Sequence, residues 1–136
     1  KQSKMRIMLD TNVLISLLLF PNQRMNAMME HIFKEHELVL SSFVVDELKD
    51  VVRRKFPAKV KVVDKLLLKM SYELVYTPEE IDETLFNIND PNDYAVLYTA
   101  IIEDVDVLIT GDKDFAKIEI EKPEILTPAE FRSKYL

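Results

Sequence analysis

Short apolar runs and amphipathic segments alternate along the chain. The apolar runs are rich in Val, Ile and Leu and are bounded by polar residues, which is typical of buried strands. They predict strands at residues 6–9, 37–40, 73–76 and 105–110, with a weaker one at 124–126. Because the strands are separated by helical segments, the pattern predicts an α/β fold with a parallel sheet and helices on both faces.

The segments between the predicted strands carry apolar residues at helical spacing. Proline marks several of their ends: Pro21 and Pro57 follow predicted helices, and Pro91 begins one. A capping box, Thr127 to Glu130, marks the start of the last helix. The predicted helices are residues 12–20, 25–34, 42–55, 59–70, 91–103 and the segment after 127, with a short helical turn at 78–84.

Composition narrows the possible chemistry. The chain has 136 residues, 48% of them hydrophobic, which predicts one domain over residues 1–136 with a substantial core. It contains no cysteine, two histidines and a single glycine, Gly111. Disulfides, thiolate metal sites and glycine-rich phosphate loops are therefore excluded, and most zinc sites are disfavoured. No apolar run reaches the roughly 18 residues of a membrane span, so we expect a cytoplasmic protein with no membrane partner.

Four acids come from four separate segments that can meet at one edge of the sheet. Asp10 follows the first strand and Asp112 the fourth, whereas Glu47 and Asp93 lie early in helices. Ligands of open α/β sheets bind beyond the carboxyl ends of the strands. Clustered carboxylates repel one another unless a cation neutralises them, and oxygen ligands alone suit Mg²⁺ or Mn²⁺. Each acid alone fits a helix cap or a turn better, but together they indicate a metal-dependent nuclease.

Four motifs follow one another along the chain: "MRIMLDTNVLIS", "SSFVVDELKDVV", "NDPNDYAVLYTA" and "LITGDKDF". Together they make the chain similar to the PIN domain family of ribonucleases, and particularly to the toxin components of prokaryotic toxin-antitoxin pairs. The resemblance implies a three-layer α/β/α sandwich with strand order 3-2-1-4-5. It implies catalytic, metal-binding roles for Asp10, Glu47, Asp93 and Asp112, and supporting roles for Asn12, Thr110 and Asp114. It further implies RNA as substrate, an antitoxin protein as a possible partner, and a homodimer.

Two other function classes remain open from the sequence. A haloacid dehalogenase-like phosphatase also places an aspartate after its first strand, as a nucleophile. That family needs a second aspartate two residues later, where this chain has Asn12. An inactive PIN-like binding module is the other alternative, although such a module would be expected to lack one of the four acids.

The basic residues are concentrated in one stretch of an acidic protein. The net charge is −6, yet residues 49–69 hold eight basic residues against two acids. Lysines that recur every four residues on one helical face repel one another, and RNA phosphates would offset that repulsion. A solvated surface helix explains the same pattern. The candidate RNA-binding residues are Arg53, Arg54, Lys61, Lys65 and Lys69.

Overall fold

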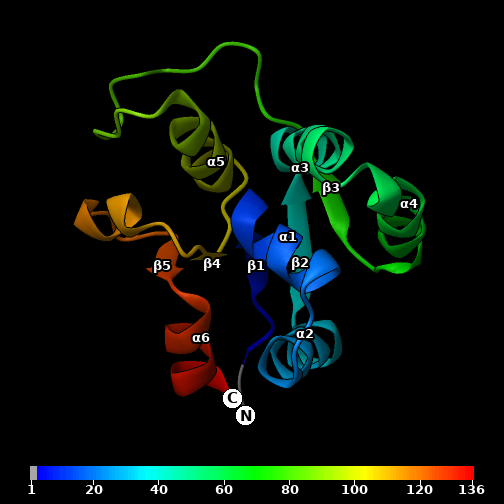
Figure 1. Cartoon of the computed structure of the whole chain (residues 1–136). Coiled ribbons are helices and arrows are strands. Elements are labelled where there is room, and N and C mark those ends of the chain that lie inside the picture. The colour runs from blue at the N-terminus through cyan, green and yellow to red at the C-terminus, as the bar shows by residue number, and fades with distance from the viewer. Residues whose placement is uncertain (1–2) are drawn as a thin grey trace.

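Five parallel strands form one sheet in the computed structural model, which describes residues 3–136 (Figure 1). The strand order is β3-β2-β1-β4-β5, which confirms the predicted parallel sheet and its order. Strand β1 is central, and its Ile7 pairs with Leu38 of β2 on one side and Val107 of β4 on the other. The strands are β1 (Arg6–Leu9), β2 (Glu37–Ser41), β3 (Glu73–Val75), β4 (Val107–Ile109) and β5 (Glu124–Leu126).

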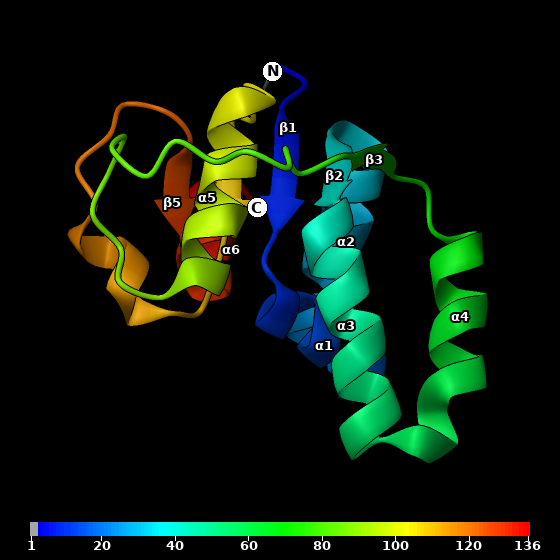
Figure 2. The ribbon, with the colours of Figure 1, turned by 90° about the horizontal axis from the view of Figure 1, so that it is seen from above.

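Helices cover both faces of this sheet, as the α/β/α prediction requires. In Figures 1 and 2, α3 and α5 lie together on one face and α2 and α6 on the other. Helix α4 packs against α3 at the outer side of the molecule. The α-helices are α1 (Thr11–Leu19), α2 (Gln23–Glu35), α3 (Ser42–Lys55), α4 (Val60–Lys69), α5 (Pro91–Ile102) and α6 (Pro128–Tyr135), and the 3-10 helices are η1 (Pro57–Lys59) and η2 (Lys113–Lys117).

None of the helices within residues 3–136 combines the length and the apolar character that a bilayer span requires. The prediction of a single domain over residues 1–136 stays a prediction, and Lys1 and Gln2 lie outside the described residues.

The core forms where the central strands meet the helices. Ile7, Met8 and Leu9 of β1 are fully buried, as expected for a strand covered on both faces. Helix α2 turns its apolar stripe inward, because Met28 and Ile32 are inaccessible to solvent. This stripe is therefore packed within the chain itself.

The segment between β3 and α5 differs from its prediction. The short helical turn predicted at residues 78–84 is wrong, since this stretch holds only bends and a turn. The cause is local: the Asp82 carboxylate accepts hydrogen bonds from the backbone N–H and the hydroxyl of Thr84, at 2.9 and 2.6 Å. An Asp side chain that takes backbone donors in this way competes with helix formation. Strand β4 is also shorter than the predicted 105–110.

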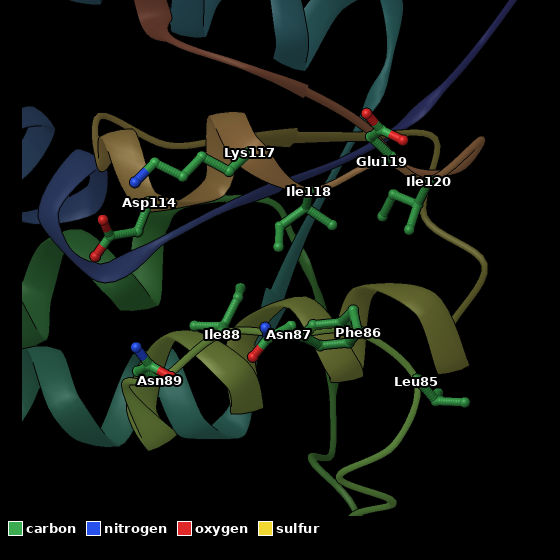
Figure 3. Close-up of a pocket in the computed structure, with 10 residues that line it drawn as sticks. All are labelled: Leu85, Phe86, Asn87, Ile88, Asn89, Asp114, Lys117, Ile118, Glu119 and Ile120. Atoms are coloured by element: carbon green, nitrogen blue, oxygen red, sulfur yellow. The ribbon is translucent and has the colours of Figure 1, made fainter.

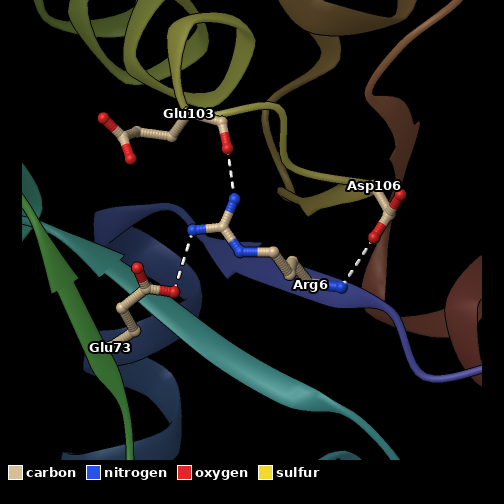
Figure 4. A network of polar contacts seen from close by, with 4 residues as sticks. All are labelled: Arg6, Glu73, Glu103 and Asp106. Atoms are coloured by element: carbon tan, nitrogen blue, oxygen red, sulfur yellow. Dashed lines mark hydrogen bonds and ion pairs between the residues drawn. The ribbon is translucent and has the colours of Figure 1, made fainter.

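Arg6 connects several segments at the amino end of the sheet (Figure 4). Its guanidinium donates to the carboxylate of Glu73 on β3, 2.9 Å away, and to the backbone carbonyl of Glu103 after α5. Its backbone N–H donates to the Asp106 carboxylate at 2.7 Å. The bond with Arg6 lowers the pKa of Glu73. One ion pair and two hydrogen bonds of Arg6 thus join the amino end of β1 to β3 and to the segment between α5 and β4.

Candidate metal centre

The carboxyl ends of β1 and β4 place two of the predicted acids at the same edge of the sheet. The strands pair in parallel, with Leu9 beside Ile109. The pairing extends one residue further, because the backbone N–H of Asp10 donates to the carbonyl of Ile109 at 3.1 Å. Asp10 and the segment that leads to Asp112 therefore leave the sheet side by side.

Thr110 links these two aspartates. Its hydroxyl donates to the Asp10 carboxylate and accepts a hydrogen bond from the backbone N–H of Asp112 at 3.1 Å. Thr110 and Asp10 are both buried. Because a buried hydroxyl with both bonds made has one stable orientation, Thr110 fixes how Asp10 lies relative to Asp112.

Asp10 is at the same time the N-cap of α1. One of its carboxylate oxygens accepts from the backbone N–H of Val13 at 3.1 Å, so the capping interpretation and the site interpretation describe the same side chain. Burial raises the pKa of the Asp10 carboxyl, and the charge of Asp112 adds to the effect. The bonds from Thr110, Val13 and the backbone of Asn12 act in the opposite direction. The side chain of Asn12 itself is exposed.

Three carboxylates converge beside Asp10. Asp93, Asp112 and Asp114 each offer one oxygen, and these oxygens lie within 4.8 Å of one another. Asp93 lies in the first turn of α5, whereas the other two come from the start of η2. We call these three residues the carboxylate cluster.

Local hydrogen bonds hold the cluster in place. The N-cap of α5, Asp90, accepts from the backbone N–H groups of Asn92 and Asp93 at 2.8 and 3.4 Å. Asp112 accepts from the N–H of Asp114 at 2.9 Å. Asp90 thus caps the helix that carries Asp93. Backbone geometry thus brings these acids together.

The electrostatics of the cluster are unfavourable without a cation. The pKa of Asp93 is raised to about 7, first by burial and then by the charge of Asp112, with smaller contributions from Asp90 and Asp10. A carboxyl with such a pKa is only partly ionised at neutral pH. A divalent cation relieves this repulsion by binding the ionised forms.

Glu47 lies apart from the tightest group. It projects from α3 and accepts a hydrogen bond from the hydroxyl of Thr11, the residue that follows Asp10. This bond connects Glu47 to the same edge of the sheet. Thr11 is not among the residues predicted from the sequence, because a threonine in the first turn of a helix carries no signal of a side-chain partner 36 residues away.

The donor set fits a hard divalent cation. All the converging groups are carboxylate oxygens, which Mg²⁺ and Mn²⁺ prefer. Asp93, Asp112 and Asp114 would hold such an ion directly, with Asp10 beside them. Of the predicted quartet, the structure thus brings Asp93 and Asp112 together, and it adds Asp114 to them.

The candidate RNA-binding residues fall into two groups. Arg53 and Arg54 both pair with Asp50, at 2.9 Å each. Within residues 3–136, no ion pair engages the three lysines of α4. These lysines, all exposed, are Lys61, Lys65 and Lys69. The helix that carries them, α4, lies on the opposite side of α3 from α5, the helix that carries Asp93 (Figure 2).

The profile of a known protein family matches most of the chain. The profile of the PIN domain matches residues 6–114. No curated protein sequence matches the chain significantly.

Solved structures agree with this match. The chain is similar to one in VapBC2 from Rickettsia felis bound to a DNA fragment from its promoter (22% identity, TM-score 0.71, covering 90% of this chain and 97% of that one). It is similar to one in FitAcB from Neisseria gonorrhoeae (22%, 0.65, 90% and 98%). It is also similar to VapC20 from Mycobacterium tuberculosis, a toxin that cleaves the sarcin-ricin loop (13%, 0.57, 81% and 92%).

Proposed function

This chain belongs to the PIN domain family, and from that premise we propose that it is a metal-dependent endoribonuclease that hydrolyses RNA phosphodiester bonds. The observation that carries the proposal is the convergence of Asp93, Asp112 and Asp114. The similarity to VapC20, a toxin that cleaves RNA of the sarcin-ricin loop, supports RNA as the substrate. Family membership also argues against the phosphatase alternative, and the presence of all four acids argues against an inactive module.

The carboxylates have distinct roles in this proposal. The carboxylate cluster would hold Mg²⁺ or Mn²⁺, with Asp10 and Glu47 completing the acidic site. When bound, such an ion supplies Lewis acidity: it lowers the pKa of a water and offsets negative charge on the phosphate. Thr110 is a positioning residue, because it orients Asp10 and the backbone of Asp112. No side chain is required to form a covalent bond to the substrate.

A cleavage assay tests the proposal. Purified protein is incubated with single-stranded RNA and Mn²⁺ or Mg²⁺, with and without EDTA. Cleavage is expected only with the free metal, and Glu47→Gln should reduce it strongly. Asp46→Asn is the matched control, because Asp46 is the neighbouring acid on α3 and is exposed. Cleavage at full rate in excess EDTA would contradict the proposal.

We also propose that the chain is a toxin that an antitoxin protein inhibits. The similar chains belong to VapBC2 and FitAcB, and VapC20 is a toxin. An apolar pocket of about 390 Å³ between α1, α2 and α4 offers a surface that a partner can cover, and it is lined in part by Leu17, Met29, Phe33 and Leu66. Expression in a bacterial host should arrest growth, and Asp93→Asn should not.

The homodimer is a separate part of the proposal. Phe33 of α2 is 42% exposed and lines the same apolar pocket, which a second copy of the chain would cover in place of an antitoxin. Light scattering of the purified protein measures its mass directly. The mass of one chain at micromolar concentration would exclude a stable homodimer.

A further inference from the structure

A pocket of about 510 Å³ adjoins the carboxylate cluster and shares Asp114 with it. One wall is the segment 85–89, which leads into α5, and the other is formed by η2 and the residues after it (Figure 3). The proposed hydrolysis assigns no role to this pocket. Its lining residues outside the cluster include Phe86, Asn87, Ile88, Asn89, Lys117 and Ile118.

The first wall is fixed to the helix that carries Asp93. Phe86 stacks on Tyr94, with ring centroids 4.1 Å apart and an interplanar angle of 19°. The Tyr94 hydroxyl donates to the carbonyl of Asp82 at 2.5 Å and accepts from the N–H of Leu85 at 3.3 Å. Tyr94 is buried and directly follows Asp93. The pocket therefore has a defined position relative to the carboxylate cluster.

The opposite wall of the pocket is held in place by η2. Phe115, which is buried in the core, lies between Asp114 and Lys117 in this short helix. Its burial holds η2 against the protein, so that Asp114 and Lys117 are presented at the surface. Asp114 thus belongs to a wall that the burial of Phe115 anchors in the core.

The lining combines apolar and hydrogen-bonding groups. Ile88 and Ile118 point toward each other across the pocket in Figure 3, and Lys117 and Asp114 lie at the same end as Asn89. Side-chain amides such as those of Asn87 and Asn89 both donate and accept hydrogen bonds. A planar heterocycle with apolar faces and a polar edge matches this lining.

We propose that this pocket binds a base of the RNA strand whose phosphate lies at the carboxylate cluster. The inference rests on the proposed function, because the position of the phosphate comes from it. Asp114 lies in both sites, so a nucleotide with its phosphate at the cluster has its base next to the pocket. Lys117 supplies a positive charge beside the backbone. Recognition of unstacked bases between apolar and aromatic side chains is the common mode for single-stranded RNA.

Binding of mononucleotides tests the pocket without interference from cleavage. The probes are the four nucleoside 5′-monophosphates and ribose 5-phosphate, which lacks the base, titrated calorimetrically in Mg²⁺. Wild-type protein should bind at least one nucleotide about tenfold more tightly than ribose 5-phosphate, from the contribution of base stacking. In Phe86→Ala the two affinities should become equal.

Two further variants distinguish an effect on base binding from an effect on folding. Phe86→Leu keeps apolar volume but loses the aromatic ring, and Asn87→Ala alters an exposed side chain. Both should lower the ratio of affinities while melting near the wild-type temperature. Ile102→Ala, a half-exposed residue at the other end of α5, should leave the ratio unchanged.

The outcomes for the pocket and for the proposed function are distinguishable. Equal affinities of wild-type protein for nucleotides and ribose 5-phosphate, or no measurable binding of either, would overturn the base pocket. So would a ratio that persists in Phe86→Ala and Phe86→Leu. If wild-type protein still cleaves RNA in those cases, the proposed function stands. If wild-type protein binds a nucleotide about tenfold more tightly than ribose 5-phosphate but does not cleave RNA, the base pocket is supported and the proposed nuclease function is contradicted.

Discussion

The hydroxyl of Thr110 donates a hydrogen bond to the carboxylate of Asp10, across the paired ends of β4 and β1. Because the same hydroxyl accepts from the N–H of Asp112, a single side chain connects the acidic residues that follow two neighbouring strands. The geometry of the proposed metal centre thus depends on a residue that needs no contact with the metal.

Replacing Thr110 by Val should therefore damage both stability and activity. The shape is conserved, but a buried Asp10 oxygen loses its donor, which costs about 1–3 kcal/mol. The pKa of Asp10 should rise further, because the lost bond holds it down. Urea denaturation and RNA cleavage measure the two effects. Thr110→Ser, which keeps the hydroxyl, should recover most of both, and wild-type behaviour of Thr110→Val would show that the bond does not matter.

The stability of the metal-free protein should fall as the pH rises from about 4 to about 7. The folded pKa of Asp93 is about 7 against an ordinary value of 3.8, so in this window the folded state binds a proton that the unfolded state has released. The unfolding free energy therefore decreases through the window and levels off above it. Melting temperatures in EDTA across pH 4 to 8 test this. Asp93→Asn should flatten the dependence, and an unchanged slope in that variant would assign it elsewhere.

Mn²⁺ or Mg²⁺ should raise the melting temperature in a saturable way at pH 7.5. An ion that binds only the folded protein adds about 2.7 kcal/mol to the unfolding free energy at a concentration 100 times its Kd. Asp112→Asn should lose most of this shift, because Asp112 lies in the carboxylate cluster and beside Asp10. Melting curves of wild-type protein that do not respond to millimolar metal would exclude the metal centre.

The lysines of α4 should contribute to RNA binding independently of the metal. Replacing Lys61, Lys65 and Lys69 together by Gln should weaken binding and reduce the slope of log K against log salt, since fewer counterions are released. Arg53 and Arg54 should contribute less, because each already pairs with Asp50. The same triple replacement by Arg is the control. A salt slope that survives the Gln substitutions would make these lysines an ordinary solvated surface.

The cleavage products should carry 5′-phosphate and 3′-hydroxyl ends, because the PIN family resemblance implies attack by water and not by the neighbouring 2′-hydroxyl. Asp10→Asn and Asp93→Asn should each abolish cleavage. End labelling combined with mass spectrometry identifies the ends. Cyclic 2′,3′-phosphates would overturn the water mechanism, and a phosphorylated Asp10 would favour the phosphatase alternative.

The sequence predicted the parallel sheet because β1 and β4 are uninterrupted apolar runs, which are typical of strands that are buried on both faces. It also identified Asp10, Glu47, Asp93 and Asp112 as acids at one edge. It did not predict that Asp114, and not Glu47, joins Asp93 and Asp112 within 4.8 Å, because that depends on the path of η2.

Two other features of the structure could not be predicted from the sequence pattern. The helical turn expected at 78–84 failed because Asp82 binds Thr84 locally, and periodicity does not register such a bond. The wall at residues 85–89 is irregular, and its position comes from the contact of Phe86 with Tyr94. Irregular segments follow individual side-chain contacts and carry no repeating pattern to read.

The two ends of β1 have different electrostatic surroundings, and the ion pair of Arg6 with Glu73 lies at the first of them. The first residue of the strand has a charge that is compensated within the chain, whereas the residue just beyond its last strand position, Asp10, lies among charges of its own sign. Because all the strands are parallel, every strand contributes its amino end to the side of Arg6 and its carboxyl end to the side of Asp10. The ion pair of Arg6 and the proposed metal centre are thereby separated by the length of one four-residue strand.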